Sequence, residues 1–204
     1  MQADQSKAIE QAAALLRQGE LIAYPTDTLY GVGAAAFDEQ AVRRLFAAKR
    51  RPLSKGIPIL LADAADLETV VSHVSAAAQR LIDRHWPGPL TLILPRRPEL
   101  PPSLAPGDTV AVRVPDHDLA RKFIAAAGGA VATSSANRSG EPAALDAQQA
   151  LAALGDVVAA VLDGGPVQHG QASTIVDCTT TPLRILRPGP LPADAVLAQE
   201  AGSA

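Results

Sequence analysis

Short apolar runs alternate with amphipathic helical patterns along most of the chain, and this alternation constrains the fold more than any other feature. Runs that predict strands lie at residues 21–24, 57–61, 90–94, 109–114, 131–133, 157–162, 173–177 and 183–186. Helical stripes lie between them, and Asp38, Asp63, Ser75 and Asp146 are placed as N-caps. Interleaved strands and helices predict an α/β fold with a mixed sheet.

The composition favours a protein with its own hydrophobic core. The chain has 204 residues, of which 48% are hydrophobic and 19% charged, so we expect one domain over residues 1–204. A net charge of −3 argues against a generally basic nucleic-acid coat, and the single Cys178 excludes a disulfide framework or a Cys-rich zinc site. We find no apolar run of about 18 residues and no signal-peptide pattern. We therefore expect a cytoplasmic protein that does not engage a membrane.

Several familiar catalytic motifs are missing or incomplete. No Walker phosphate loop is present. Residues 31–36 fit G-x-G-x-x-A, but they lie away from the predicted strand, and no acidic residue follows at the required distance. The four histidines are scattered, and Ser139 lacks the glycine that precedes the nucleophile in an elbow. We expect neither a metal site nor a covalent nucleophile.

Three polar segments remain as candidate ligand sites. Their sequences are PTDTLYGVG at 25–33, KRRPLSKG at 49–56 and TSSANRSG at 133–140. The first and third follow predicted strands, where α/β sheets place ligands, and the second combines the cations that a polyphosphate requires. Each segment also has a plainer interpretation, as a polar turn or as a solvated basic helix end.

In this order and spacing, the three segments resemble the Sua5/YciO/YrdC family, and within it the short YrdC-type threonylcarbamoyl-AMP synthases. The resemblance runs over about residues 11–187 and leaves 188–204 as a C-terminal tail. The family's K-x-R and S-x-N motifs correspond to a catalytic set of Lys49, Arg51, Ser135 and Asn137. The resemblance implies an open, twisted YrdC-like mixed sheet with a basic concave ligand site.

The resemblance also implies a reaction and its binding residues. L-threonine, bicarbonate and ATP would give threonylcarbamoyl-AMP and diphosphate for the t6A modification of tRNA, with Mg²⁺ on the phosphates and t6A transfer proteins downstream. The residues implied for L-threonine are Thr28, Leu60, Arg113, Thr133 and Ser173. Those implied for ATP are Arg51, Lys55, Thr109, Ser135, Ala143 and Arg187. Leu60 stands where many relatives have histidine and offers backbone groups alone, and Ala143 contributes backbone or shape.

Both reactants are anionic, so this chemistry depends on positioning and charge compensation. We expect Lys49, Arg51 and Lys55 to neutralise the triphosphate, and Arg113 to clamp the threonine carboxylate. Two other functions are open at this point. One is a non-catalytic RNA-binding module with weak RNA contact through the basic segment. The other is a carbamoyl-transfer enzyme of the same fold.

Overall fold

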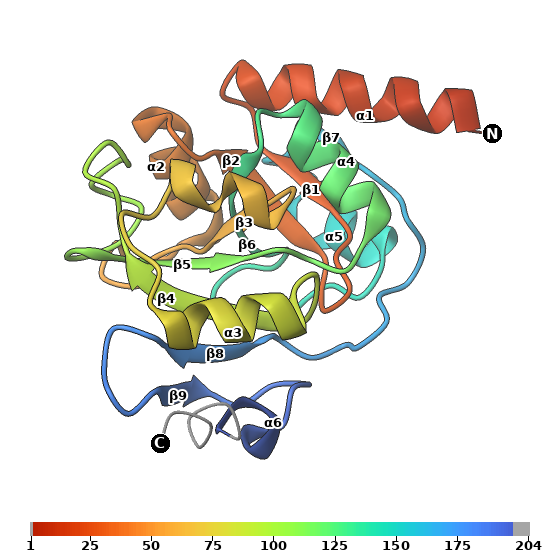
Figure 1. Cartoon of the computed structure of the whole chain (residues 1–204). Coiled ribbons are helices and arrows are strands. Elements are labelled where there is room, and N and C mark those ends of the chain that lie inside the picture. Colours follow the sequence, from red (N-terminus) through yellow and green to blue (C-terminus); the bar gives the residue numbers. More distant parts are fainter. Residues whose placement is uncertain (1, 198–204) are drawn as a thin grey trace.

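A computed structural model describes residues 2–197, and one mixed sheet runs through them (Figure 1). Within these residues the strands are β1 (Ile22–Tyr24), β2 (Gly31–Ala35), β3 (Ile59–Leu61), β4 (Leu90–Pro95), β5 (Thr109–Arg113), β6 (Ala130–Ser135), β7 (Ala160–Val161), β8 (Thr174–Asp177) and β9 (Arg184–Arg187). Their spatial order is β7-β1-β2-β6-β3-β5-β4-β8-β9. The pairs β1–β7, β3–β5 and β4–β8 are parallel and the other neighbours are antiparallel. The predicted α/β fold with an open mixed sheet is confirmed.

Four of the helices begin at the predicted caps. They are α1 (Gln2–Arg17), α2 (Glu39–Lys49), the 3₁₀ helix η1 (Ala64–Thr69), α3 (Ala76–His85), α4 (Asp118–Ala126), α5 (Ala147–Leu154) and α6 (Ala193–Leu197). The side chains of Asp38, Asp63, Ser75 and Asp146 accept backbone N–H groups of the first turn in α2, η1, α3 and α5. Helix α6 lies in the predicted tail, of which residues 198–204 fall outside the described residues. No helix within residues 2–197 is long and apolar enough to cross a bilayer.

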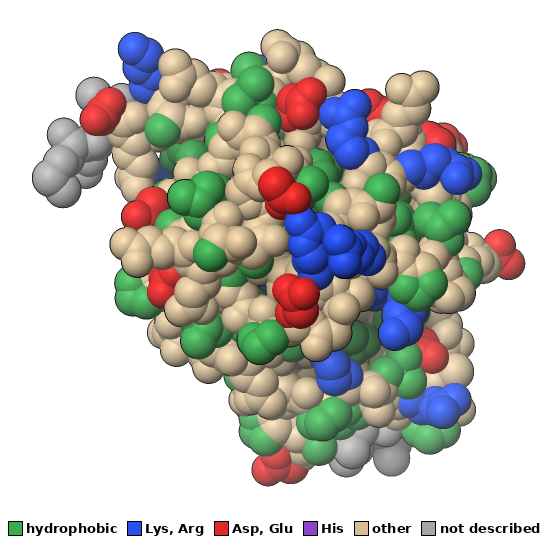
Figure 2. All heavy atoms as spheres, turned by 180° about the vertical axis from the view of Figure 1, so that it is seen from behind, with side chains coloured by type: hydrophobic (Ala, Val, Ile, Leu, Met, Phe, Trp, Pro, Cys, Tyr) green, Lys and Arg blue, Asp and Glu red, His purple; other side chains and the backbone are tan. Residues whose placement is uncertain are grey.

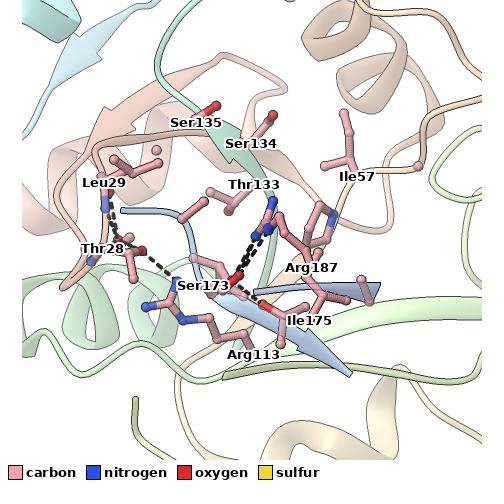
Figure 3. A pocket seen from close by; sticks show the side chains of 18 of the residues that line it. Thr28, Leu29, Ile57, Arg113, Thr133, Ser134, Ser135, Ser173, Ile175 and Arg187 are labelled. Carbon is pink, nitrogen blue, oxygen red and sulfur yellow. Dashed lines mark hydrogen bonds between the residues drawn. The ribbon is translucent and has the colours of Figure 1, made fainter. Parts of the chain in front are cut away.

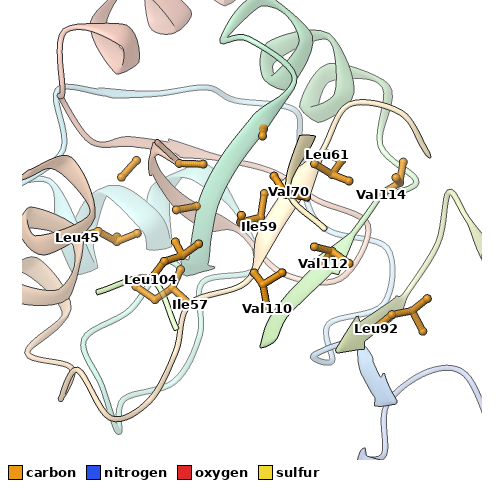
Figure 4. Close-up of a cluster of buried hydrophobic side chains, with 14 of the residues drawn as sticks. Leu45, Ile57, Ile59, Leu61, Val70, Leu92, Leu104, Val110, Val112 and Val114 are labelled. Carbon is orange, nitrogen blue, oxygen red and sulfur yellow. The ribbon is translucent and has the colours of Figure 1, made fainter. Parts of the chain in front are cut away.

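The two faces of the sheet have different surroundings. On one face, Val110 and Val112 of β5 join Leu92 of β4 and Leu45 of α2 in the larger buried cluster (Figure 4). On the other face, α1 and α4 pack over one end of the sheet and enclose a smaller cluster that includes Leu60. The remainder of this second face is left uncovered by these two helices. Strand alternation therefore turns every second residue of β4, β5, β6 and β8 toward an open area.

One predicted loop is partly a strand. The expected polar loop over residues 25–33 ends in β2, which lies between β1 and β6. The sequence pattern hid this strand, because glycine has a low strand propensity and little apolar signal. Since β2 runs antiparallel and does not open a helix, the dinucleotide interpretation of residues 31–36 is excluded. The strand predicted over residues 157–162 is also shorter than expected, since β7 covers two residues, which pair with β1 at the sheet edge.

Candidate active site

A cavity of about 420 Å³ lies on the uncovered face of the sheet. Its floor is built by alternate residues of the strands, among them Thr109, Ala111 and Arg113 of β5. The walls come from the 25–30 loop, the basic segment after α2 and the loop before β8. Figure 3 shows Thr28, Arg113, Ser173 and Arg187 converging on this space from separate elements. The three polar segments of the sequence thus meet in one hollow.

Arg113 anchors one end of the cavity. Its Nη1 donates to Thr28 Oγ1 at 2.7 Å, its Nη2 to Asp27 Oδ1 at 2.5 Å and its Nε to the carbonyl oxygen of Gly88 at 2.9 Å. The Arg113 and Asp27 side chains are 5% and 0% exposed, so this ion pair is buried. Burial lowers the pKa of Arg113, and the Asp27 carboxylate opposes that shift. A guanidinium carries five N–H groups, so two remain for a ligand carboxylate once these three bonds are made.

The Thr28 hydroxyl is held in place by a short turn. Thr26 Oγ1 accepts from the backbone N–H groups of Thr28 and Leu29 at 3.1 and 3.2 Å, and it donates to the carbonyl oxygen of Leu29 at 2.7 Å. The Thr26 and Thr28 hydroxyl oxygens lie 3.0 Å apart. Such local side-chain bonds are the reason threonine favours turns. Here the turn aims Thr28 at Arg113 and into the cavity.

Two further guanidinium groups line the same cavity. Arg51 donates from Nε to the carbonyl oxygen of Lys55 at 2.8 Å and from Nη2 to that of Gly56 at 2.9 Å. Arg187 donates to the carbonyl oxygen of Ser173 from Nε at 3.0 Å and from Nη2 at 2.8 Å (Figure 3). Burial lowers the pKa of Arg187, and the charge of Arg51 lowers it further. Arg51 is half-buried and Arg187 is exposed. Two neighbouring cations that repel each other favour an anion bound between them.

Lys49 lies behind this wall. Its Nζ donates to the carbonyl oxygen of Ser135, to the carbonyl oxygen of Asn137 at 2.6 Å and to Asn137 Oδ1 at 3.1 Å. Ser135 Oγ donates to the same Asn137 Oδ1 at 2.6 Å. Burial and the neighbouring charge of Arg51 lower the pKa of Lys49 to about 8. Lys49 therefore ties the end of α2 to the turn that follows β6.

The proline-rich loop at residues 96–108 forms part of the cavity rim. Ala105 and Pro106 line the cavity, and Leu104 is fully buried in the larger cluster. The Arg96 guanidinium donates to carbonyl oxygens within the loop, including those of Leu100 and Ala105. The loop is also tied to the segment before β3, since the Ile57 N–H donates to the carbonyl oxygen of Leu104 at 2.8 Å. These contacts hold the loop against the rim of the cavity.

The cavity brings together nine of the residues that the sequence singled out. The predicted residues that line it are Thr28, Arg51, Leu60, Thr109, Arg113, Thr133, Ser135, Ser173 and Arg187. Lys49 and Asn137 are buried next to Ser135 and do not line the cavity. Lys55 is exposed beside Arg51, and Ala143 is half-buried away from the lining. The roles of all these residues remain predictions.

Sequence reasoning missed Asp27 and Tyr24. Asp27 lies within the first polar segment, where the hydroxyl groups are the predicted ligand contacts, and its carboxylate binds Arg113. Tyr24 lies in a predicted strand that carries no predicted ligand contact, yet its hydroxyl oxygen lies 2.6 Å from Thr133 Oγ1. An acid directly before Thr28 was a visible signal for the first. The second had no local signal, because the two residues lie 109 positions apart.

Comparisons with known proteins agree on one family. The Sua5/YciO/YrdC family model, described as telomere recombination, matches residues 14–189. A threonylcarbamoyl-AMP synthase of Pyrococcus abyssi is 41% identical over 92% of this chain. A putative threonylcarbamoyl-AMP synthase of Mycobacterium tuberculosis is 40% identical over 94% of this chain and 88% of its own length. The crystal structure of Pyrococcus abyssi Sua5 with L-threonine superposes with a TM-score of 0.92 at 39% identity, covering 95% of this chain and 57% of that one.

The chain thus spans a little over half the length of the Pyrococcus abyssi protein and most of the length of the Mycobacterium tuberculosis protein. Because the family model covers most of the chain and identities near 40% extend over more than nine-tenths of it, the protein belongs to the Sua5/YciO/YrdC family.

Proposed function

We propose that this chain is an L-threonylcarbamoyladenylate synthase, a nucleotidyltransferase that joins L-threonine, bicarbonate and ATP. The observation that carries the proposal is one cavity lined by three guanidinium groups, those of Arg51, Arg113 and Arg187. These three cations suit two anionic reactants that must approach each other. The names of the relatives, threonylcarbamoyl-AMP synthase, support the same reaction.

At the Arg113 end, the remaining guanidinium N–H groups would bind the threonine carboxylate, and the Thr28 hydroxyl lies beside them. Leu60 supplies an apolar wall there, and Ser173 contributes a hydroxyl from the opposite side. Bound in this way, threonine directs its amino group toward the other end of the cavity. The neutral amine adds to the carbon of bicarbonate, and water leaves as the N–C bond forms. The product is a carbamate.

At the other end, Arg51 and Arg187 would bind the triphosphate, with Ser135 and Thr109 nearby in the lining. A carbamate oxygen attacks the α-phosphorus, the bond to the β-phosphate oxygen breaks, and diphosphate leaves. Protein groups act by alignment and by neutralising charge, and no covalent intermediate with the chain is required. Lys49 adds positive charge from behind the wall and, with Asn137, positions the Ser135 turn. Lys55 at the exposed rim and Ala143 complete the proposed ATP contacts.

Mg²⁺ would enter as the magnesium complex of ATP, since polyphosphate oxygens are its preferred ligands. In the described part of the chain, no three His, Cys, Asp or Glu side chains gather into a metal-binding group. The Asp27 carboxylate near the cavity is engaged by Arg113. The metal would therefore be held by substrate oxygens, and its charge would add to that of Arg51 and Arg187.

We also propose that the chain acts as one domain in the cytoplasm and passes its product to proteins that complete t6A on tRNA. The alternative of a non-catalytic RNA-binding module has less support. On the face shown in Figure 2, one compact group of basic side chains lies near the middle, and acidic side chains flank it. A continuous basic surface, which phosphate-backbone binding favours, is not seen on that face.

The decisive experiment measures diphosphate release from ATP, Mg²⁺ and bicarbonate, with and without L-threonine. We expect release to require both L-threonine and bicarbonate, and mass spectrometry to show the threonylcarbamoyl adenylate. L-serine in place of L-threonine tests whether the cavity recognises the methyl group. Salt-dependent RNA binding without threonine-dependent use of ATP would contradict the proposal and favour the RNA-binding alternative.

A further inference from the structure

Tyr24 lies at the border between the covered part of the sheet and the cavity. It is fully buried, and its ring packs against Phe123 of α4 with the ring centroids 4.9 Å apart. Its hydroxyl oxygen lies 2.6 Å from Thr133 Oγ1, and Thr133 lines the cavity. The Tyr24 hydroxyl is thus a polar group of the apolar cluster under α1 and α4, and it lies at the edge of the proposed threonine site.

The hydrogen bonds around Thr133 determine which atom donates. Thr133 Oγ1 donates its own proton to the carbonyl oxygen of Val131 at 3.0 Å. Among the described residues, Thr133 is the hydrogen-bond partner of the Tyr24 hydroxyl. A buried hydroxyl proton without an acceptor would lower the stability of the fold. Tyr24 therefore donates to Thr133. With its proton used and one lone pair filled, Thr133 Oγ1 can offer a ligand one further lone pair and nothing else.

Two glycines of β2 leave room for this pair. A Cβ atom on Gly31 would lie 2.7 Å from Thr133 Cγ2. A Cβ atom on Gly33 would lie 3.0 Å from Tyr24 Cε1 and 2.7 Å from Val131 Cγ1. All three distances are too short for comfortably packed carbon atoms, so any larger residue would displace Tyr24, Val131 or Thr133. The G-x-G pattern of the sequence thus serves close packing around the Tyr24–Thr133 contact.

We propose that Tyr24 is a positioning residue that fixes the Thr133 hydroxyl as a hydrogen-bond acceptor toward the cavity, so that the site selects ligands with a donor at that point. L-threonine has two such donors, its amino group and its hydroxyl. A carboxylate has none, which keeps the threonine carboxylate at Arg113. The inference rests on the proposed function, because it assumes that L-threonine is the ligand.

The test is a double-mutant cycle on the full chain, with L-threonine affinity measured by calorimetry in the absence of ATP. Tyr24→Phe keeps the ring and removes the hydroxyl, and Thr133→Val removes the acceptor. We expect Tyr24→Phe to weaken L-threonine binding about 3- to 10-fold, and Thr133→Val by roughly 10-fold. The double variant should bind no more weakly than Thr133→Val alone, because Tyr24 acts through the Thr133 hydroxyl.

Thr133→Ser retains the hydroxyl, so Tyr24→Phe should again weaken binding in that background. Phe123→Leu is the matched packing control, since it disturbs the contact with the Tyr24 ring and leaves the hydroxyl in place. It should lower the melting temperature and change L-threonine affinity less than twofold. Two analogues identify which group of L-threonine donates to Thr133: L-valine lacks the hydroxyl, and 3-hydroxybutyrate lacks the amino group. The Tyr24 and Thr133 variants should not weaken binding of the analogue that lacks the donating group.

Three results would overturn the inference: unchanged affinity in Tyr24→Phe, additive losses in the double variant, or equal losses for all three ligands. The last two would show a purely structural role. If the unsubstituted protein does not bind L-threonine, the proposed function fails as well. If it binds L-threonine with an affinity independent of Tyr24, the inference about Tyr24 fails alone.

Discussion

Replacing Asp27 with asparagine should destabilise the protein strongly. Asp27→Asn keeps the size of the side chain and one oxygen for Arg113, but it removes the negative charge next to a guanidinium that is 5% exposed. Leaving a buried charge without its partner costs about 3–5 kcal/mol of unfolding free energy. For a chain of this size, that loss corresponds to a melting temperature lower by roughly 6–20 °C.

The assay is urea unfolding followed by circular dichroism, without ligand. Asp118→Asn is the matched control, because Asp118 pairs with Lys122 at 2.6 Å on the exposed surface of α4. That change should cost less than about 0.5 kcal/mol.

Arg113→Met tests the origin of the loss, since it removes the other charge of the buried pair. We expect the Asp27→Asn/Arg113→Met double variant to be more stable than Asp27→Asn alone, with a coupling free energy of about 3 kcal/mol. A loss below about 1 kcal/mol for Asp27→Asn, or additive effects of the two substitutions, would refute the assignment of Asp27 as the partner that compensates Arg113.

Three further predictions concern the basic segment. Arg51→Ala should lower kcat/KM for diphosphate release by an amount equivalent to about 2–4 kcal/mol. Arg43→Ala, which breaks an exposed ion pair, should leave kcat/KM near normal. Normal diphosphate release by Arg51→Ala would remove Arg51 from the mechanism. Arg50 closes α2 in the left-handed region, with φ 51° and ψ 41°, where glycine is less strained than arginine. Arg50→Gly should therefore raise the unfolding free energy by about 0.5–1 kcal/mol, while Arg43→Gly inside the helix should lower it by about 1 kcal/mol. Denaturant unfolding measures both changes, and a less stable Arg50→Gly would contradict the strain at Arg50. The pKa of Lys49 is about 8 in the folded protein and 10.5 ordinarily, so the unfolded chain binds more protons between these pH values. The unfolding free energy of the unsubstituted protein, relative to that of Lys49→Met, should therefore rise from pH 8 to 10.5 by up to about 3 kcal/mol. A difference that stays flat with pH would show that the Lys49 pKa is not lowered.

Local sequence signals predicted most of the elements. The caps at Asp38, Asp63, Ser75 and Asp146 were readable because a capping side chain bonds to N–H groups two or three residues away. Alternation along β5 was readable because every second residue is apolar. Strand β2 was not readable, since its glycines are selected by contacts with Thr133 and Val131 and not by strand propensity.

The candidate site was predicted in part. The motifs, through their resemblance to a family, identified Thr28, Arg51 and Ser135, and these three residues line one cavity. They did not show that Lys49 turns away from that cavity toward the carbonyl oxygens of Ser135 and Asn137. The direction of a long side chain depends on which acceptors the fold places near it, and these acceptors lie 86 and 88 positions away.

The amino-acid sequence by itself determined the α/β class, the starts of α2, η1, α3 and α5, the family and the kinds of side chain available for chemistry, because each depends on residue type and short-range spacing. Tertiary structure alone decided the strand order, the part of the sheet left uncovered by α1 and α4, and the pairing of Asp27 with Arg113 and Tyr24 with Thr133. These features join residues 86 and 109 positions apart. Contacts at that separation arise from packing the whole sheet, and no local pattern of residues encodes them.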